Sequence, residues 1–131
     1  LQLKKARKRY FYYFVIQKGN SFLMKKREEK DIWHGLYDFV AIETKRPVDP
    51  EKLFMENDSL KKFRNGKLSD ISGMYKHILS HQLIYSRFTQ ISLSRDVALD
   101  GSGLKFYSLK KLADLPKPVL ISKFLSDYGI L

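Results

Sequence analysis

The amino-acid sequence predicts an α+β domain built on a mixed or antiparallel sheet. Strand-like segments come first, a short helical insert follows, and further strands precede two closing helices. Hydrophobic residues make up 44% of the 131 residues, which is enough for one core and argues against disorder. We expect a folded domain over residues 10–131, preceded at residues 1–9 by the end of an interdomain linker that becomes a strand.

The first half of the chain predicts a hairpin, a third strand and a short helix. Residues 10–17 are aromatic and β-branched without alternation, as in a strand that is buried on both faces. A turn at 18–21 leads to a second strand at 22–24, and a third strand is expected at 36–42. An Asp-Pro pair at 49–50 supplies an N-cap and a first helical position, so a helix is expected to begin there.

The second half predicts a second hairpin, a short strand and two helices. Strands are expected at 74–79 and 83–93, joined by a tight turn, and a shorter one at 105–107. Ser108 can cap the first of the closing helices, and Pro118 starts the second, whose apolar residues recur at a spacing of four.

The charge balance favours a partner that carries phosphate or an anionic membrane surface. The chain has 25 Lys and Arg residues against 14 Asp and Glu residues, a formal net charge of +11. No apolar run approaches the roughly 20 residues of a membrane span. Of the two kinds of partner we expect the nucleic acid and no membrane. Two basic groups are candidates for phosphate contact, although both are also consistent with a solvated surface. They comprise Lys4, Lys5, Arg7, Lys8 and Arg9 on the N-terminal arm, and Lys61, Lys62, Arg64 and Lys67 around a predicted loop at Gly66.

The residue types that carry cofactor chemistry are scarce. Cysteine is absent, which excludes disulfides, a thiol nucleophile and an iron–sulfur cluster in this chain. His77 and His81 have the i,i+4 spacing of a zinc pair on a helix, but on a strand they would lie about 13 Å apart. We therefore expect no metal site and no cofactor.

Two features remain that could touch nucleic acid. Ser80 and His81 lie at the tip of the second predicted hairpin, where they could enter a groove or could simply be polar turn residues. Trp33 could act as a wedge or a stacking surface, but we favour the interpretation that it anchors the core.

Two motifs about forty residues apart make the chain similar to the C-terminal domain of the MutY family of adenine DNA glycosylases. They are Ile32–Phe39 (IWHGLYDF) and His77–Gln82 (HILSHQ). The paired strands that begin at Arg9 and the closing segment 115–125 fit in the same order, so the resemblance spans almost the whole chain. It implies a Nudix-like (MutT-like) fold, in which a mixed sheet is sandwiched by helices.

The resemblance also implies a function in base excision repair. The domain would recognise 8-oxoguanine opposite adenine in double-stranded DNA, in the bacterial cytoplasm at the nucleoid. Catalysis and a 4Fe–4S cluster belong in this family to an N-terminal catalytic domain, which would be a partner within the same protein. The chain starts at Leu1 without a Met, so we expect a fragment of that longer protein.

The lesion-recognition residues implied by the resemblance are Leu79, Ser80 and His81. They match the family motif Phe-Ser-His, with Leu in place of Phe. The oxidised base differs from guanine by an N7–H donor and a carbonyl at C8, and a serine hydroxyl can accept from that donor.

Two alternatives belong to other classes of protein. MutT-type hydrolases need an Arg-Glu-x-x-Glu-Glu helix that binds divalent metal, and no such pattern follows Gly35. We therefore expect the domain not to be catalytic alone, and keep a divergent Nudix hydrolase of oxidised nucleotides as the alternative. A general binder of single-stranded nucleic acid is the third reading, and it predicts no preference for the lesion.

Overall fold

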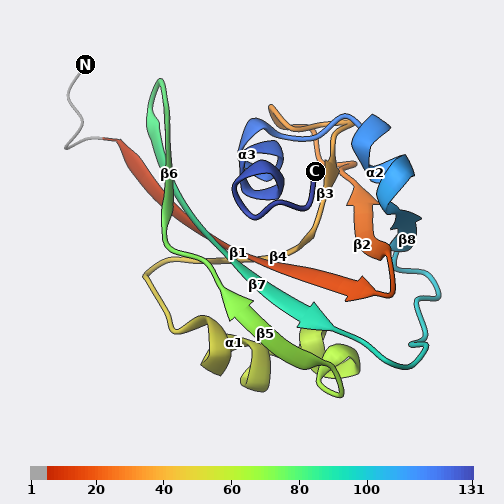
Figure 1. The fold of residues 1–131 in the computed structure, drawn as a ribbon. Helices are drawn as coiled ribbons and strands as arrows, with labels where there is room; N and C mark the ends of the chain where they lie inside the picture. The colour runs from red at the N-terminus through yellow and green to blue at the C-terminus, as the bar shows by residue number, and fades with distance from the viewer. Residues whose placement is uncertain (1–5) are drawn as a thin grey trace.

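A computed structural model describes residues 6–131 and places the strands in one mixed sheet (Figure 1). Strands and helices alternate along the chain much as the sequence predicts. In order they are β1 (Arg7–Lys18), β2 (Ser21–Lys26), β3 (Tyr37–Asp38), β4 (Val40–Thr44), α1 (Pro50–Glu56), the 3-10 helix η2 (Asp58–Phe63), β5 (Lys67–Ile71), β6 (Tyr75–Leu79), β7 (Gln82–Ser92), β8 (Lys105–Ser108), α2 (Leu109–Asp114) and α3 (Val119–Asp127).

The long strand β1 organises the sheet. On one side it pairs in parallel with β7, from Arg7 opposite Gln82 to Gln17 opposite Ser92. On the other side it pairs antiparallel with β4 and, near its end, with β2. The sheet is therefore mixed, as the sequence predicts, and the hairpin of β1 and β2 is confirmed.

Helices cover both faces of this sheet. Figure 1 shows α1 on one face and α2 and α3 on the other. The sequence explains why, because β1 is buried without interruption from Phe11 to Ile16. Alternate residues of that run belong to two separate apolar clusters, one with α2 and α3 and the other with α1 and η2. The expected architecture, a mixed sheet sandwiched by helices, is confirmed.

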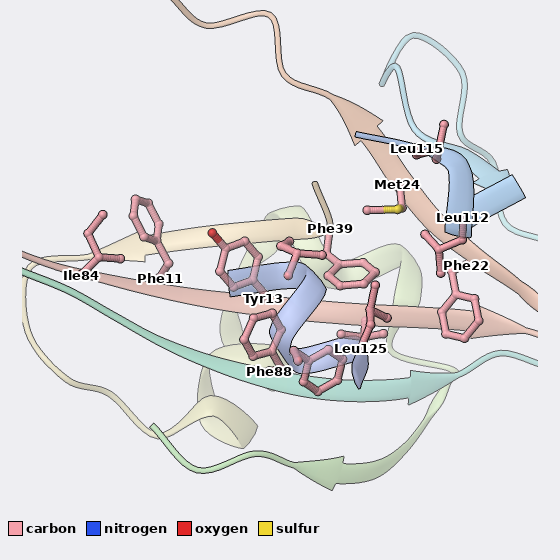
Figure 2. Close-up of a cluster of buried hydrophobic side chains, with 13 residues drawn as sticks. Phe11, Tyr13, Phe22, Met24, Phe39, Ile84, Phe88, Leu112, Leu115 and Leu125 are labelled. Carbon is pink, nitrogen blue, oxygen red and sulfur yellow. The ribbon is translucent and has the colours of Figure 1, made fainter. Parts of the chain in front are cut away.

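The cluster beneath α3 is built from stacked aromatic rings (Figure 2). Tyr13 stacks on Phe88 with ring centroids 4.9 Å apart, and Phe88 stacks on Phe124 at 4.3 Å. This column joins β1, β7 and α3, so it fixes the last helix over the centre of the sheet.

The predicted helix caps are confirmed. The Asp49 side chain accepts a hydrogen bond from the backbone N–H of Glu51 at 3.1 Å, and Pro50 occupies the start of α1. Ser108 does the same for α2, where its hydroxyl accepts from the N–H of Lys111 at 3.2 Å.

Three boundaries differ from the sequence prediction. The expected strand at 36–42 is broken at Phe39, because β3 pairs with β2 whereas β4 pairs with β1. At the break, the Asp38 carboxylate accepts a hydrogen bond from the backbone N–H of Phe39 at 2.9 Å. The expected loop around Gly66 is short, and the unpredicted strand β5 begins directly after it. The last residues of the predicted linker segment 1–9 belong to the sheet, because β1 begins at Arg7.

Gly66 has a packing reason for being glycine. A Cβ atom there would lie 2.5 Å from Cγ2 of Ile91 and 2.9 Å from Cδ2 of Leu93. The turn before β5 therefore rests directly on β7, and any side chain at this position would push the two segments apart.

Candidate nucleic-acid interface

The hairpin of β6 and β7 extends beyond the helices at the end of the sheet where β1 begins (Figure 1). Its strands are in register up to Leu79 opposite Gln82, so Ser80 and His81 alone form the turn. Both residues are exposed. The backbone carbonyl of His81 accepts a hydrogen bond from the N–H of Arg7 at 2.9 Å, which ties the tip to the start of β1.

The two apolar residues before the turn face opposite ways. Leu79 is half-buried and packs against the cluster beneath α3, whereas Ile78 leaves 56% of its surface exposed. Alternation along a strand explains this arrangement, since Lys76 and Ile78 share one side of β6 and His77 and Leu79 share the other. Leu79 therefore packs beneath the tip, and Ile78 is the exposed apolar side chain of β6 nearest to it.

Several cations surround the tip. Arg7 and Lys8 are exposed on β1 and lie opposite Gln82 and Leu83 of β7. Lys76 is exposed on β6, opposite Tyr85 of β7. The sequence motifs did not single out Lys76, although it lies on the predicted strand that leads to the turn. Two further predicted phosphate contacts, at Lys4 and Lys5, lie outside the described residues.

The second basic group lies at the other end of the sheet. Lys67 opens β5 opposite Ser92, ten residues along β7 from Gln82, which corresponds to about 33 Å. Lys61 and Lys62 are exposed on the nearby η2, but Arg64 donates to the backbone carbonyls of Phe54 and Asn57. The structure therefore does not bring the two predicted phosphate-binding groups together.

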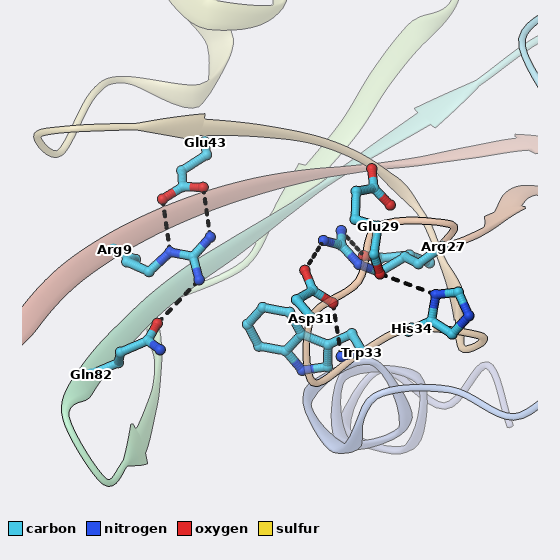
Figure 3. Close-up of polar contacts among 9 residues, drawn as sticks. Arg9, Arg27, Glu29, Asp31, Trp33, His34, Glu43 and Gln82 are labelled. Atoms are coloured by element: carbon cyan, nitrogen blue, oxygen red, sulfur yellow. Dashed lines mark hydrogen bonds and ion pairs between the residues drawn. The ribbon is translucent and has the colours of Figure 1, made fainter.

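Arg9 is engaged inside the protein (Figure 3). Its Nε donates to Oε2 of Glu43 at 2.9 Å and its Nη2 to Oε1 of the same carboxylate at 2.8 Å. Its Nη1 donates to Oε1 of Gln82 at 3.1 Å. The hydrogen bond to Glu43 raises the pKa of Arg9, against the opposing effect of burial. Arg9 is therefore a link between β1, β4 and the hairpin, and each of its three guanidinium nitrogens already donates within the protein.

Trp33 lies between two guanidinium groups (Figure 3). The Arg9 guanidinium is 5.7 Å from the ring centroid and that of Arg27 is 5.5 Å from it. The edge of the ring meets Phe11 with centroids 5.9 Å apart. Trp33 is half-buried against the α3-side cluster, so its position favours the core-anchor interpretation over a DNA wedge.

Arg27 also holds the only carboxylate that is buried among residues 6–131. Its Nη2 donates to Asp31 at 2.6 Å and its Nη1 to Asp38 at 3.4 Å. Burial raises the pKa of Asp38 to about 7, although Arg27 and the N–H of Phe39 act in the opposite direction. Desolvation therefore outweighs the interactions that favour the charged carboxylate of Asp38.

The three histidines stand apart from one another. His34 lies in the loop after β2 with its Nδ1 3.2 Å from the carbonyl of Glu29, whereas His77 is on β6 and His81 in the turn. In the described part of the chain, no three His, Asp or Glu side chains gather as metal ligands would. None of the helices over residues 6–131 is long and apolar enough to cross a membrane.

Comparison with known proteins identifies relatives of this fold. A family model described as the NUDIX domain matches residues 12–127. No curated protein matches the chain. Among solved structures, the C-terminal domain of mouse MUTYH, in complex with human PCNA, has a TM-score of 0.67 at 14% identity, covering 92% of this chain and 87% of that chain.

Hydrolases of the same fold are equally similar. MutT from Methanosarcina mazei has a TM-score of 0.69 at 16% identity, with 95% of both chains covered. The Ap4A hydrolase of C. elegans has a TM-score of 0.64 at 11% identity, covering 92% of this chain and 95% of that chain. At such low sequence identities the similarity establishes the fold alone. The function has to be inferred from the residues of the candidate site.

Proposed function

The chain belongs to the NUDIX domain family, and from that premise we propose that it reads 8-oxoguanine opposite adenine in double-stranded DNA. In this proposal it serves base excision repair as the C-terminal domain of an adenine DNA glycosylase in the bacterial cytoplasm. Adenine removal, and the 4Fe–4S cluster, belong to the N-terminal catalytic domain of the same protein. The isolated domain binds and does not catalyse.

The observation that carries the proposal is the exposed tip of the second hairpin. Ser80 and His81 project from the end of the sheet, with cations at Arg7, Lys8 and Lys76 beside them. Phosphate contacts from these cations would set the position of the duplex, and the tip would then read a base edge. The Ser80 hydroxyl can accept from the N7–H of 8-oxoguanine, which guanine lacks.

The mismatch with guanine gives the expected discrimination. Guanine lacks the C8 carbonyl to which a backbone N–H of the turn could donate, so that N–H would be left without a partner, and the Ser80 hydroxyl would have to rotate and donate to the N7 acceptor instead. An unmet hydrogen bond of this kind costs roughly 1–3 kcal/mol. That cost corresponds to a preference for the lesion of about 5- to 150-fold.

Because Leu79 points inward, Leu79 and its neighbour Ile78 are given different roles in DNA binding. We assign Leu79 to the support of the tip and Ile78 to contact with the bases, because Ile78 is the exposed apolar residue of β6 nearest the turn. A branched apolar side chain beside a base-reading hydroxyl can act as a wedge between base steps. His81, as the neighbour of Ser80, lies at the DNA surface.

The contact surface can be mapped directly. Amide chemical shifts of the chain would be followed during titration with a duplex that holds one 8-oxoguanine:adenine pair. We expect the perturbed residues to centre on the β6–β7 turn and the start of β1. Perturbation that centres on Lys61, Lys62 and Lys67 instead would contradict this interface.

A divergent Nudix hydrolase is the second candidate, favoured by the likeness in fold to MutT. It predicts magnesium-dependent release of pyrophosphate from oxidised nucleoside triphosphates by this chain. The available metal ligands give the hydrolase little support, because in residues 6–131 no three acidic or histidine side chains lie close enough together to hold a metal ion. Measurable turnover that depends on magnesium would replace the recognition proposal with this one.

A further inference from the structure

Strand β6 has a side that no other strand covers. It pairs with β7 alone, from Tyr75 opposite Ser86 to Leu79 opposite Gln82. Figure 1 shows β6 at the margin of the sheet, on the hairpin that extends beyond the helices. The backbone groups on its outer side therefore have no neighbouring strand to bond.

The register identifies which backbone groups face outward. The turn has two residues, so Leu79 and Gln82 form the hydrogen-bonded pair that closes the hairpin. Such pairs recur at every second residue, which directs the N–H and C=O groups of Lys76 and Ile78 away from β7. Among residues 6–131, the backbone hydrogen bonds of turns and loops do not reach Lys76 or Ile78 either. Their backbone groups are therefore an open template for a further strand.

The side chains along this edge combine apolar surface with a free cation. Among residues 6–131, Ile78 is the one large apolar residue within a strand that is exposed, at 56%. Lys76 shares its side of β6, and no carboxylate in the described part of the chain lies within 4.0 Å of its ammonium group. Met74, directly before β6, is 47% exposed. Along the chain, the edge therefore presents a cation between two exposed apolar residues.

Charge decides which kind of strand fits this edge. A second copy of the chain is disfavoured, because the antiparallel register that brings Met74 opposite Ile78 also brings Lys76 opposite Lys76. The net charge of +11 adds to that repulsion. An acidic side chain opposite Lys76 is attracted instead, and an apolar side chain opposite Ile78 covers its exposed surface.

We propose that the outer edge of β6 binds an extended acidic segment of another protein as an added antiparallel strand. An acidic residue of the segment lies opposite Lys76, and an apolar residue two positions earlier lies opposite Ile78. In this mode of recognition the main-chain hydrogen bonds supply affinity and the alternate side chains supply specificity. Lys76 and Ile78 also belong to the proposed DNA contact, so the test contains no DNA and its outcome does not depend on lesion recognition.

A short capped peptide tests the proposal through the amide chemical shifts of the chain. The probe is Thr-Val-Thr-Glu-Thr-Val-Thr, whose Glu aligns with Lys76 and whose first Val aligns with Ile78. We expect saturable perturbation centred on β6, with a Kd below about 1 mM, and about fivefold weaker binding of a peptide with Lys in place of Glu. No saturation by about 10 mM, perturbation centred elsewhere, or equal binding of the two peptides would overturn the proposal.

Methylation of peptide nitrogens separates strand addition from simple charge attraction. N-methylation of the Glu and the first Val blocks the two N–H groups that face β6. N-methylation of the Thr residues that follow each of them blocks two N–H groups that face away, and keeps the same side chains. We expect the first methylated peptide to bind about tenfold more weakly than the second. Equal binding of both would overturn strand addition.

Charge reversal on the protein gives a matched test. Lys76→Glu should abolish the preference for the Glu peptide and bind the Lys peptide about fivefold better than the parent chain does. Lys110→Glu, at an exposed position of α2, should change either affinity by less than about twofold. A preference for the Glu peptide that survives Lys76→Glu would overturn the proposal. So would a dimer of the chain in sedimentation that Ile78→Lys dissociates, because the edge would then belong to a second copy.

Discussion

Arg9 holds Glu43 through two parallel hydrogen bonds of 2.9 and 2.8 Å, and its third contact reaches Gln82 at the base of the hairpin. Lysine keeps the charge but cannot form this fork. We expect Arg9→Lys to lower the free energy of unfolding by about 1 kcal/mol in urea titrations. Arg7→Lys, on an exposed neighbour, should change it by less than about 0.5 kcal/mol.

The same link gives a prediction about binding. If Arg9 positions the hairpin, Arg9→Lys should reduce lesion preference, whereas Arg7→Lys should leave the preference intact because it keeps a phosphate-binding charge. An Arg9→Lys variant that loses stability but retains full preference would limit Arg9 to a role in folding.

The raised pKa of the buried Asp38 carboxyl should make the stability of the fold depend on pH. Burial raises its pKa to about 7, whereas an unfolded Asp titrates near about 3.9. The folded state therefore binds a proton between these values, and this contribution to stability is present at low pH and is lost as the pH rises through 7. We expect Asp38→Asn to gain stability relative to the parent chain by up to roughly 4 kcal/mol between pH 4 and pH 8. Parallel stability curves of the two proteins would contradict the assignment.

Two buried serines provide a matched pair. Ser72 is 1% exposed, accepts from the N–H of Phe88 at 2.9 Å and donates to the carbonyl of Gly73 at 2.8 Å. Ser86 is 0% exposed, and its hydroxyl has no hydrogen-bond partner among the described residues. Ser72→Ala should cost about 1–3 kcal/mol of unfolding free energy, and Ser86→Ala should be neutral or stabilising. Equal losses in urea titrations would contradict this distinction.

Ile78 and Leu79 should separate binding from stability. Leu79→Ala removes a side chain that packs on the core, so it should lower the free energy of unfolding by about 1–3 kcal/mol. Ile78→Ala should change stability by less than about 0.5 kcal/mol but weaken binding to the lesion duplex. If Ile78→Ala lowered the stability and left binding to the lesion duplex unchanged, Ile78 would be the supporting residue and not the contact with the bases.

Much of the fold could be predicted because local chemistry and tertiary structure agree there. The run Phe11–Ile16 is apolar without alternation, and it is buried on both faces. Asp49 and Ser108 form the caps that their positions suggest. By contrast, β5 carries only Leu68 and Ile71 as apolar residues and is a strand because β7 pairs with it across a bulge.

The candidate site was only partly predictable, because it depends on which strands are neighbours. The motif located the turn at Ser80 and His81, but not the side to which Ile78 and Leu79 point. The sequence also could not reveal that Arg9 is held by a residue 34 positions away. Ion pairs of this kind follow from the register of β1 and β4, which local patterns do not encode.

Relative affinity for two duplexes that differ only in the lesion tests the central claim most directly. The chain would be titrated over a range of salt concentrations with 8-oxoguanine:adenine and guanine:adenine duplexes, together with Ser80→Ala and the exposed control Ser94→Ala. We predict a preference for the lesion that Ser94→Ala retains and Ser80→Ala abolishes. Equal, steeply salt-dependent binding of both duplexes by all three proteins would contradict lesion recognition by this hairpin.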